Sequence, residues 1–162
     1  MRILLTKLSH QRHALEIVRT DGSRDAIELV TRETMFHDFL HYAVEASMPT
    51  QRGFWGLLAG GKTFADMNDR SGAALKKNAA TLAVVEGTVG MMTGAMKSAV
   101  SDDQVVAGFR RYHEELAQEP PDWFTRRFVV DVRERMRRLQ GHWKATPYGE
   151  SMEIVWTETE PG

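Results

Sequence analysis

The segment ALEIVRTDGSRDAIELV, residues 14–30, decides the fold class of this chain. Apolar and polar residues alternate in both of its halves, which is the period of a half-buried β-strand. Between the halves lie Asp21 and Gly22, a dipeptide that favours a tight hairpin turn because glycine adopts a positive φ without strain. The segment therefore predicts two antiparallel strands. Their inward side chains are expected to be Leu15, Ile17, Ile27 and Leu29.

Two further strands are predicted outside this hairpin. Residues 3–8 form a short apolar run before it, and residues 152–157 return to the alternating pattern near the end of the chain. A lone C-terminal strand needs a sheet to join, and the other predicted strands are all N-terminal. We therefore predict an α+β fold, in which an antiparallel sheet of about four strands, three N-terminal and one C-terminal, packs against about four helices.

The helices are predicted from apolar residues that recur at spacings of three and four. We place them at residues 34–48, 77–99, 101–118 and 122–141. Thr34, Ser101 and Asp122 are the expected N-caps, and Gln104 completes a capping box with Ser101. Residues 53–63, between the first two helices, are expected to form a packed loop.

The helix at residues 77–99 carries Gly87, Gly90 and Gly94. Each glycine costs a helix about 1 kcal/mol relative to alanine. We expect a neighbouring backbone to approach this face closely and to offset that cost. A helix of the same chain is the simpler partner, and a second copy of the chain, forming a homodimer, is the other.

Length, charge and cysteine content bound the class of protein. The 162 residues fit one domain, residues 1–162, and 21 Lys and Arg against 22 Asp and Glu give a net charge of -1, which argues against nucleic acid and anionic membranes as partners. The absence of cysteine excludes disulfides, thiolate zinc ligands and a cysteine nucleophile. Lys7 interrupts the N-terminal apolar run too early for a signal peptide, and the uncharged run 87–96 is about half a membrane span. We therefore expect a soluble cytoplasmic protein with no membrane partner.

The first predicted helix carries a candidate metal site. His37 and His41 are four residues apart, a spacing at which two histidines on one helix face can bind one divalent metal. Glu45 is a third candidate ligand, although eight residues of helix span about 12 Å. Asp38 is the candidate catalytic residue, as a base or as a group that orients a ligand. Remote histidines are alternative third ligands, namely His10, His13, His113 and His142.

Two histidines with a carboxylate or a third histidine suit zinc, iron(II), nickel or manganese. The alternative interpretation needs no metal. His37 and His41 fall on the polar side of an amphipathic helix, where they would face solvent, and Glu45 would pair with His41 four residues away. Both interpretations stay open at the level of sequence.

The run His37-Asp38-Phe39-Leu40-His41 resembles the zincin motif, in which a glutamate directly after the first histidine acts as general base. Asp38 departs from that motif by one methylene, and the resemblance covers five residues, so no peptidase activity is transferred. The longer segment, with the pattern HDxxHYxVE, is similar to a segment of small uncharacterised bacterial proteins. That resemblance implies no activity.

Residues 56–63, GLLAGGKT, match the phosphate-binding pattern GxxxxGKT letter for letter. Such a loop must follow a buried strand and open a helix, so that backbone N–H groups meet the phosphates. Residues 49–55 do not have the pattern of a buried parallel strand, and the chain shows no βαβ alternation. We therefore interpret the match as a coincidence of spelling.

The last predicted helix is rich in arginine. Residues 119–144 carry a net charge of +3 and the rest of the chain -4, with Arg126, Arg133 and Arg137 on one stripe. The stripe suits phosphates or an acidic partner. A solvated face on which Asp131 and Glu134 pair with arginines is the simpler interpretation, so nucleic acid is not expected.

Two function hypotheses follow from these patterns. In the first, His37, His41 and Glu45 bind zinc or another divalent transition metal and support hydrolase-type chemistry with Asp38. Replacing His41 by Ala is then expected to abolish metal binding without unfolding the chain. In the second, the protein is a non-catalytic interaction or regulatory module that uses its arginine-rich helical surface, and its partner protein is not specified by the sequence.

Overall fold

Four antiparallel strands form the sheet that the sequence predicts. The computed structural model of the chain describes residues 1–50, 52–69 and 71–157. The strands are β1 (Arg2–Lys7), β2 (Arg12–Val18), β3 (Arg24–Val30) and β4 (Ser151–Val155), in the order β3-β2-β1-β4. The C-terminal strand pairs with β1, as expected. The α+β fold with three N-terminal strands and one C-terminal strand is therefore confirmed.

The hairpin between β2 and β3 closes at the predicted turn. Gly22 has φ +84°, and the N–H of Arg19 donates to the carbonyl of Ser23 across the turn. In the resulting register Leu15 pairs with Ile27. This puts all four predicted inward residues on one face of the sheet, where those of β2 are fully buried and those of the edge strand β3 half-buried.

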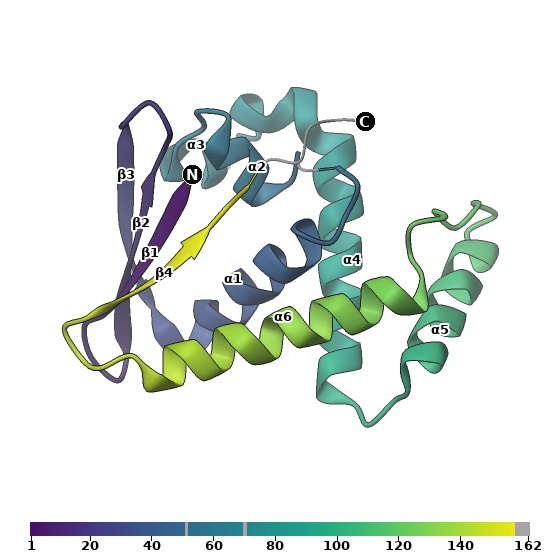
Figure 1. Cartoon of the computed structure of the whole chain (residues 1–162). Coiled ribbons are helices and arrows are strands. Elements are labelled where there is room, and N and C mark those ends of the chain that lie inside the picture. Colours follow the sequence, from purple (N-terminus) through teal and green to yellow (C-terminus); the bar gives the residue numbers. More distant parts are fainter. Residues whose placement is uncertain (51, 70, 158–162) are drawn as a thin grey trace.

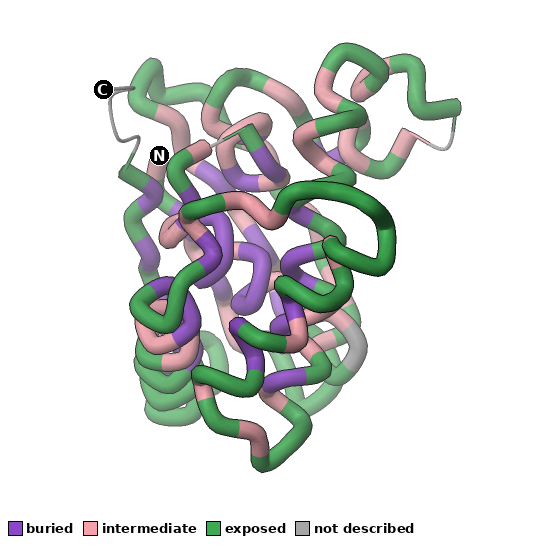
Figure 2. Tube along the Cα trace, turned by 90° about the vertical axis from the view of Figure 1, so that its right-hand side faces the viewer, coloured by how far each residue is buried: buried purple, intermediate pink, exposed green. Residues whose placement is uncertain are grey.

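The helices are α1 (Thr31–Glu45), α2 (Phe54–Ala59), α3 (Phe64–Met67), the 3-10 helix η1 (Ala73–Asn78), α4 (Ala79–Lys97), α5 (Asp102–Glu115) and α6 (Arg126–Ala145). The four long helices lie on one side of the sheet (Figure 1). Helix α1 follows β3 directly and contacts the sheet, α2, α4 and α6. It is thus the central element of the fold. The buried positions gather in the interior of the molecule (Figure 2).

Two of the three predicted N-caps are wrong. Helix α1 begins at Thr31 rather than after Thr34, whose hydroxyl instead donates to the carbonyl of Val30. Helix α6 begins at Arg126, so its N-cap is Thr125 and not Asp122. At α1 the N-cap residue is Val30, which makes no side-chain cap bond, whereas at α6 the hydroxyl of Thr125 accepts the N–H of Phe128.

The remaining helix boundaries follow the sequence more closely. Ser101 and Gln104 form the predicted capping box at the start of α5. The segment expected to be a loop, residues 53–63, instead contains the short helix α2. A short helix of this kind is stabilised by tertiary contacts rather than by its own propensity.

Helix α4 exposes its glycines. An alanine Cβ built at Gly87, Gly90 or Gly94 meets no described atom within 4 Å, so the expected close approach of another helix of this chain is wrong. The homodimer stays a prediction. The continuous helical segment Ala73–Lys97 is long and apolar enough to cross a bilayer by length and composition, and 28% of its most apolar window is buried. The cytoplasmic location and the absence of a membrane partner likewise stay predictions.

Replacing Gly90 by Ala is expected to stabilise the chain by up to about 1 kcal/mol, because alanine has the higher helix propensity and its Cβ meets open space. Urea unfolding of the variant and of the parent chain measures the difference. A loss of stability together with a change from dimer to monomer in solution would show instead that this face packs against a second copy.

His13 is the inward residue of β2 that the sequence pattern missed. It is fully buried, and its Nδ1 lies 3.1 Å from the hydroxyl of Thr31 at the start of α1. Burial disfavours the charged imidazolium and lowers the pKa of His13 to about 4. At neutral pH the ring is therefore neutral, and it serves as a structural residue between the sheet and α1.

The folded chain is expected to lose stability through His13 as the pH falls. Because the folded pKa is lower than the unfolded value near 6.5, the unfolded state binds more protons below that pH. The contribution of neutral His13 to the unfolding free energy is fully present above pH 6.5 and is lost as the pH falls toward 4. Urea unfolding at pH 8 and pH 5 measures this change. Between the two pH values, the unfolding free energy of a His13→Leu variant should fall by about 1–2 kcal/mol less than that of the parent chain. Equal losses in the two proteins would contradict the assignment.

Candidate metal centre

The polar face of α1 is partly covered. Helices α4 and α2 pack against α1. His41 is 4% exposed and Glu45 is fully buried, whereas His37 stays exposed. Polar side chains buried in this way must bond to one another or to backbone, since an unpaired buried charge is costly. The interpretation of His41 as a solvent-facing histidine is therefore wrong.

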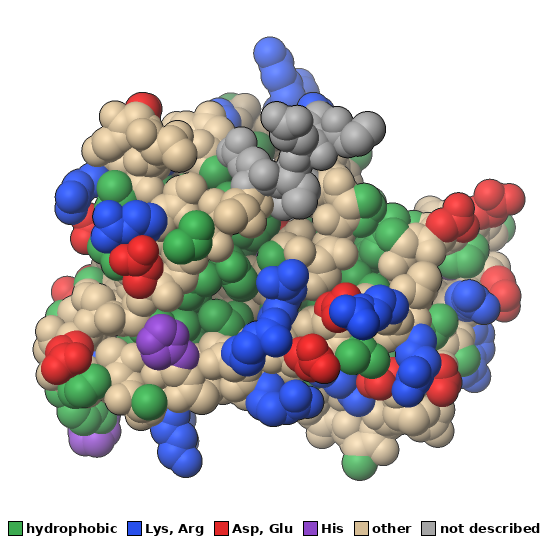
Figure 3. All heavy atoms as spheres, viewed as in Figure 1, with side chains coloured by type: hydrophobic (Ala, Val, Ile, Leu, Met, Phe, Trp, Pro, Cys, Tyr) green, Lys and Arg blue, Asp and Glu red, His purple; other side chains and the backbone are tan. Residues whose placement is uncertain are grey.

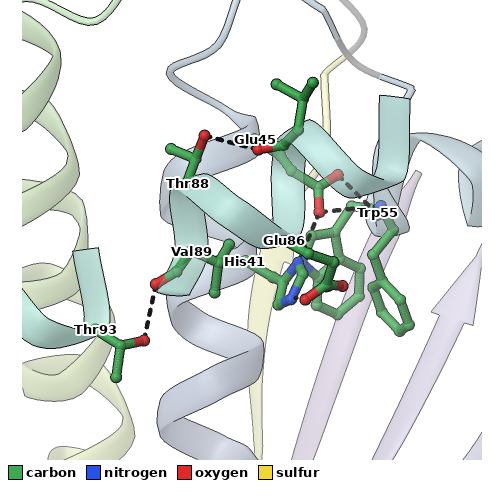
Figure 4. Close-up of polar contacts among 9 residues, drawn as sticks. His41, Glu45, Trp55, Glu86, Thr88, Val89 and Thr93 are labelled. Carbon is green, nitrogen blue, oxygen red and sulfur yellow. Dashed lines mark hydrogen bonds and ion pairs between the residues drawn. The ribbon is translucent and has the colours of Figure 1, made fainter. Parts of the chain in front are cut away.

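His41 lies between two carboxylates (Figure 4). Its Nδ1 is 3.2 Å from Oε1 of Glu45, and its Nε2 is 3.4 Å from Oε1 of Glu86, which α4 contributes. The side chain of Glu86 is 56% exposed. One nitrogen of the imidazole thus faces the protein interior, and the other faces a carboxylate at the surface.

Glu45 also holds the start of α2. Its Oε1 accepts a hydrogen bond from the backbone N–H of Phe54 and its Oε2 one from Trp55, each at 3.0 Å. Gly53, the N-cap residue, has no side chain to do this. A Cβ at Gly53 would lie 2.4 Å from Oε2 of Glu45, so the glycine leaves room for the carboxylate. Glu45 therefore connects His41 to α2.

His37 completes a compact group of ligand-type atoms. Its ring meets that of His41 edge to face, with the centroids 4.5 Å apart. One ligand atom each of His37, His41 and Glu86 lies within 4.8 Å of the other two. Two atoms that bind one tetrahedral zinc at about 2.1 Å are about 3.4 Å apart, which is the separation between His41 and Glu86.

The charges of this group depend on its neighbours. Burial alone would lower the pKa of His41, but the hydrogen bonds and negative charges of Glu45 and Glu86 outweigh it and raise the pKa to about 9. The hydrogen bond from His41 lowers the pKa of Glu86, while burial raises that of Glu45. We place the shared proton on His41, because two carboxylates face it and Glu45 also accepts two backbone N–H bonds.

Asp38, next to His37 on α1, has a carboxyl oxygen without a hydrogen-bond partner in the described part of the chain. This atom, Oδ2, is buried. Burial raises the pKa of Asp38 to about 7, against the opposing charge of His41. Buried carboxyl oxygens are normally hydrogen-bonded, so this oxygen is available to accept a bond from a ligand or from water.

These groups open into a pocket of about 360 Å³. Its polar end is formed by His37, Asp38, His41 and Glu86. Its apolar wall is formed by Phe54, Met67, Leu75 and Leu82. The polar end comes from α1 and α4, and the wall comes from α2, α3, η1 and α4. The pocket thus joins ligand-type atoms to an apolar chamber.

The structure brings together most of the predicted site residues and replaces one of them. His37, Asp38 and His41 line the pocket. The carboxylate of Glu45 lies behind His41 and accepts two backbone hydrogen bonds from α2. Glu86 takes the place expected for the third ligand. Sequence reasoning missed Glu86 as a member of this cluster, although it is the one charged residue between positions 78 and 96.

The remote histidines proposed as third ligands have other surroundings. His10 contacts the hydroxyl of Tyr148, His13 contacts Thr31, and His113 contacts the backbone carbonyl of Phe109. His142 is exposed on α6. The described residues that line the pocket include none of these four.

The segment with the phosphate-loop spelling lacks the geometry of such a loop. Its first residues belong to α2, and the backbone N–H groups of Gly60, Gly61 and Lys62 already bond to carbonyls of α2. The carboxylate of Asp66 accepts the N–H of Thr63. These N–H groups are therefore not free to bind phosphate, in agreement with a coincidental match.

The arginine stripe of α6 is interrupted by structural contacts. Arg133 donates to the carbonyls of Ala95 and Val100 and pairs with Asp102, so it ties α6 to the end of α4 and the start of α5. Arg127 pairs with Asp131 at 2.9 Å. Basic and acidic side chains are mixed along this helix (Figure 3). This arrangement favours the interpretation of a solvated, ion-paired face.

Comparisons with protein-family models, with curated protein sequences and with solved structures find no match to this chain. The function must therefore be argued from the pocket itself.

Proposed function

We propose that the protein binds one divalent metal ion through His37, His41 and Glu86. The observation that carries the proposal is the position of His41, whose Nε2 points to Glu86 and the pocket while Glu45 holds its Nδ1 from behind. Metal-binding histidines commonly donate their second N–H to a carboxylate, which fixes the tautomer and the ring orientation. Glu45 is suited to that role.

The ligand set favours zinc. Two imidazoles and one carboxylate, with a coordination position left for water or substrate, form the usual donor set of catalytic zinc sites. Iron(II), nickel and manganese accept the same donors, in keeping with the range expected from the sequence. The side chain of Glu86 is half-exposed, so a metal ion can reach the site from solvent without unfolding of the core.

The proposed chemistry is hydrolytic. A divalent metal supplies a Lewis acid that activates water at neutral pH. Asp38 lies in the same pocket, where its carboxylate can take a proton from the attacking water and return it to the leaving group. In an acyl substrate, the bond between the carbonyl carbon and the leaving group breaks. The hydroxyl of water joins the carbonyl carbon, and the proton that Asp38 took from water joins the leaving group. Asp38 is thereby proposed as general base and acid.

Elemental analysis of untagged protein purified without chelator tests the proposal. The parent chain should hold close to one equivalent of metal, or take up one equivalent of added zinc. A His37→Ala/Glu86→Gln variant should hold none. The matched control is His142→Ala/Glu134→Gln, which removes a histidine and a glutamate exposed on α6 and should retain the metal.

The outcome that would contradict the proposal is also defined by the structure. Without a metal, His41 is a buried cation that pairs with two carboxylates and holds α1, α2 and α4 together. A parent chain that takes up no metal beyond the level of its His37→Ala/Glu86→Gln variant would show that this ion pair is structural only.

A further inference from the structure

We infer that the pocket takes a small, uncharged carboxamide with an apolar substituent, held between the proposed metal and the wall of Phe54, Met67, Leu75 and Leu82. The inference rests on the proposed function and names the ligand of that site. Three features of the pocket carry it, namely its wall, its charge and the unused oxygen of Asp38.

The wall accounts for the apolar substituent. Leu75 and Leu82 are half-buried and face the pocket, yet neither belongs to the hydrophobic core that the sheet and the long helices enclose. Phe54 and Met67 pack against that core and extend its surface to the pocket. Apolar side chains from four separate elements therefore converge on one chamber that the core does not fill, and an apolar group entering it gains burial.

The charge of the pocket argues against a phosphorylated or otherwise anionic ligand. The described residues that line it include two carboxylates and two histidines, and no Lys or Arg. Phosphate sites commonly rely on arginine, lysine or several metal ions to balance the ligand charge. Here one divalent ion would already be balanced by Glu86 and Asp38, so an uncharged ligand fits best.

Asp38 favours an amide over an ester. Its buried Oδ2 lacks a hydrogen-bond partner among the described residues, and Asp38 lines the same pocket as the three proposed ligands. A carboxamide offers an N–H next to its carbonyl oxygen, so it can donate to Asp38 while the carbonyl faces the metal. An ester has no such donor and would not bond to this oxygen directly.

The size of the pocket limits the ligand. A volume of about 360 Å³ is at the lower end of the roughly 300–1,000 Å³ that ligand pockets span. It holds an aromatic or short aliphatic group together with one amide. A longer peptide would have to extend through the mouth of the pocket, where the wall residues no longer cover it.

Calorimetric titration of zinc-loaded protein tests this inference, with hydroxamates as probes because their oxygens bind zinc, their N–H can donate to Asp38, and the two compounds differ only in the apolar substituent. Benzohydroxamate should bind at least about tenfold more tightly than acetohydroxamate, since filling an apolar wall gives differences of roughly 10- to 200-fold. Inorganic phosphate should bind more weakly than either probe.

A matched pair of variants locates the effect. Leu82→Asn should abolish most of the preference for benzohydroxamate and leave acetohydroxamate binding unchanged. Leu116→Asn, at the exposed C-cap leucine of α5, should leave both unchanged. Equal affinities for the two hydroxamates, or tighter binding of phosphate, would overturn the inference while leaving the metal site in place. Failure to load zinc, seen before any probe is added, would overturn the proposed function and this inference together.

Discussion

The variant Glu86→Gln is expected to bind zinc more than about 100-fold more weakly than the parent chain and to keep its fold. Losing a carboxylate that only orients a metal ligand costs about 10- to 100-fold in affinity, and losing a ligand should cost more. The fold should survive because the Glu86 side chain is 56% exposed and its contact to His41 is long, at 3.4 Å. Competition with a chromogenic zinc chelator measures the affinity, and thermal unfolding monitors the fold.

Glu134→Gln is the matched control for this variant, because Glu134 is an exposed glutamate on α6, away from the pocket. It should bind zinc with the affinity of the parent chain. If Glu86→Gln and Glu134→Gln bound zinc equally tightly, Glu86 would not be a ligand, and the site would have to be rebuilt around another group.

The variant Glu45→Ala is expected to lose about 3–5 kcal/mol of unfolding free energy, the cost of removing one partner from a buried ion pair. Three groups lose their acceptor in this variant: Nδ1 of His41 and the N–H groups of Phe54 and Trp55. A loss of this size is a large fraction of the 5–15 kcal/mol typical of a whole domain. Urea unfolding of the metal-free protein measures it.

If Glu45→Ala does not fold, Glu45→Gln provides the same test in a milder form. The amide keeps the shape of the side chain and can accept from α2, but it lacks the charge that faces His41. It should fold, with a smaller loss of stability, and should bind zinc about 10- to 100-fold more weakly than the parent chain. Parent-like stability in both variants would contradict the role assigned to Glu45.

The strands and their inward faces were predictable because hairpin signals are local. The alternation on both sides of Gly22 fixes which residues share a face, and the register follows from the turn. The capping box of Ser101 and Gln104 was predictable for the same reason, since its hydrogen bonds join residues three positions apart.

The site was only partly predictable because its contacts are long-range. Positions 37 and 41 share a helix face by spacing alone, so their proximity followed from the sequence. The burial of Glu45 depends on α2, nine residues further along the chain, and the third ligand comes from α4. No periodicity in α1 indicates which helix covers its polar face. The isolated charge of Glu86 within an apolar helix was the one available signal.

Anomalous diffraction from crystals of the zinc-loaded protein, recorded at the zinc absorption edge, locates the bound ion. We expect one peak at the seam of α1 and α4, about 2.0–2.2 Å from Nε2 of His41, a ring nitrogen of His37 and an oxygen of Glu86. A zinc-loaded chain whose only peak lies elsewhere, for example at the exposed His142, would contradict the proposed site.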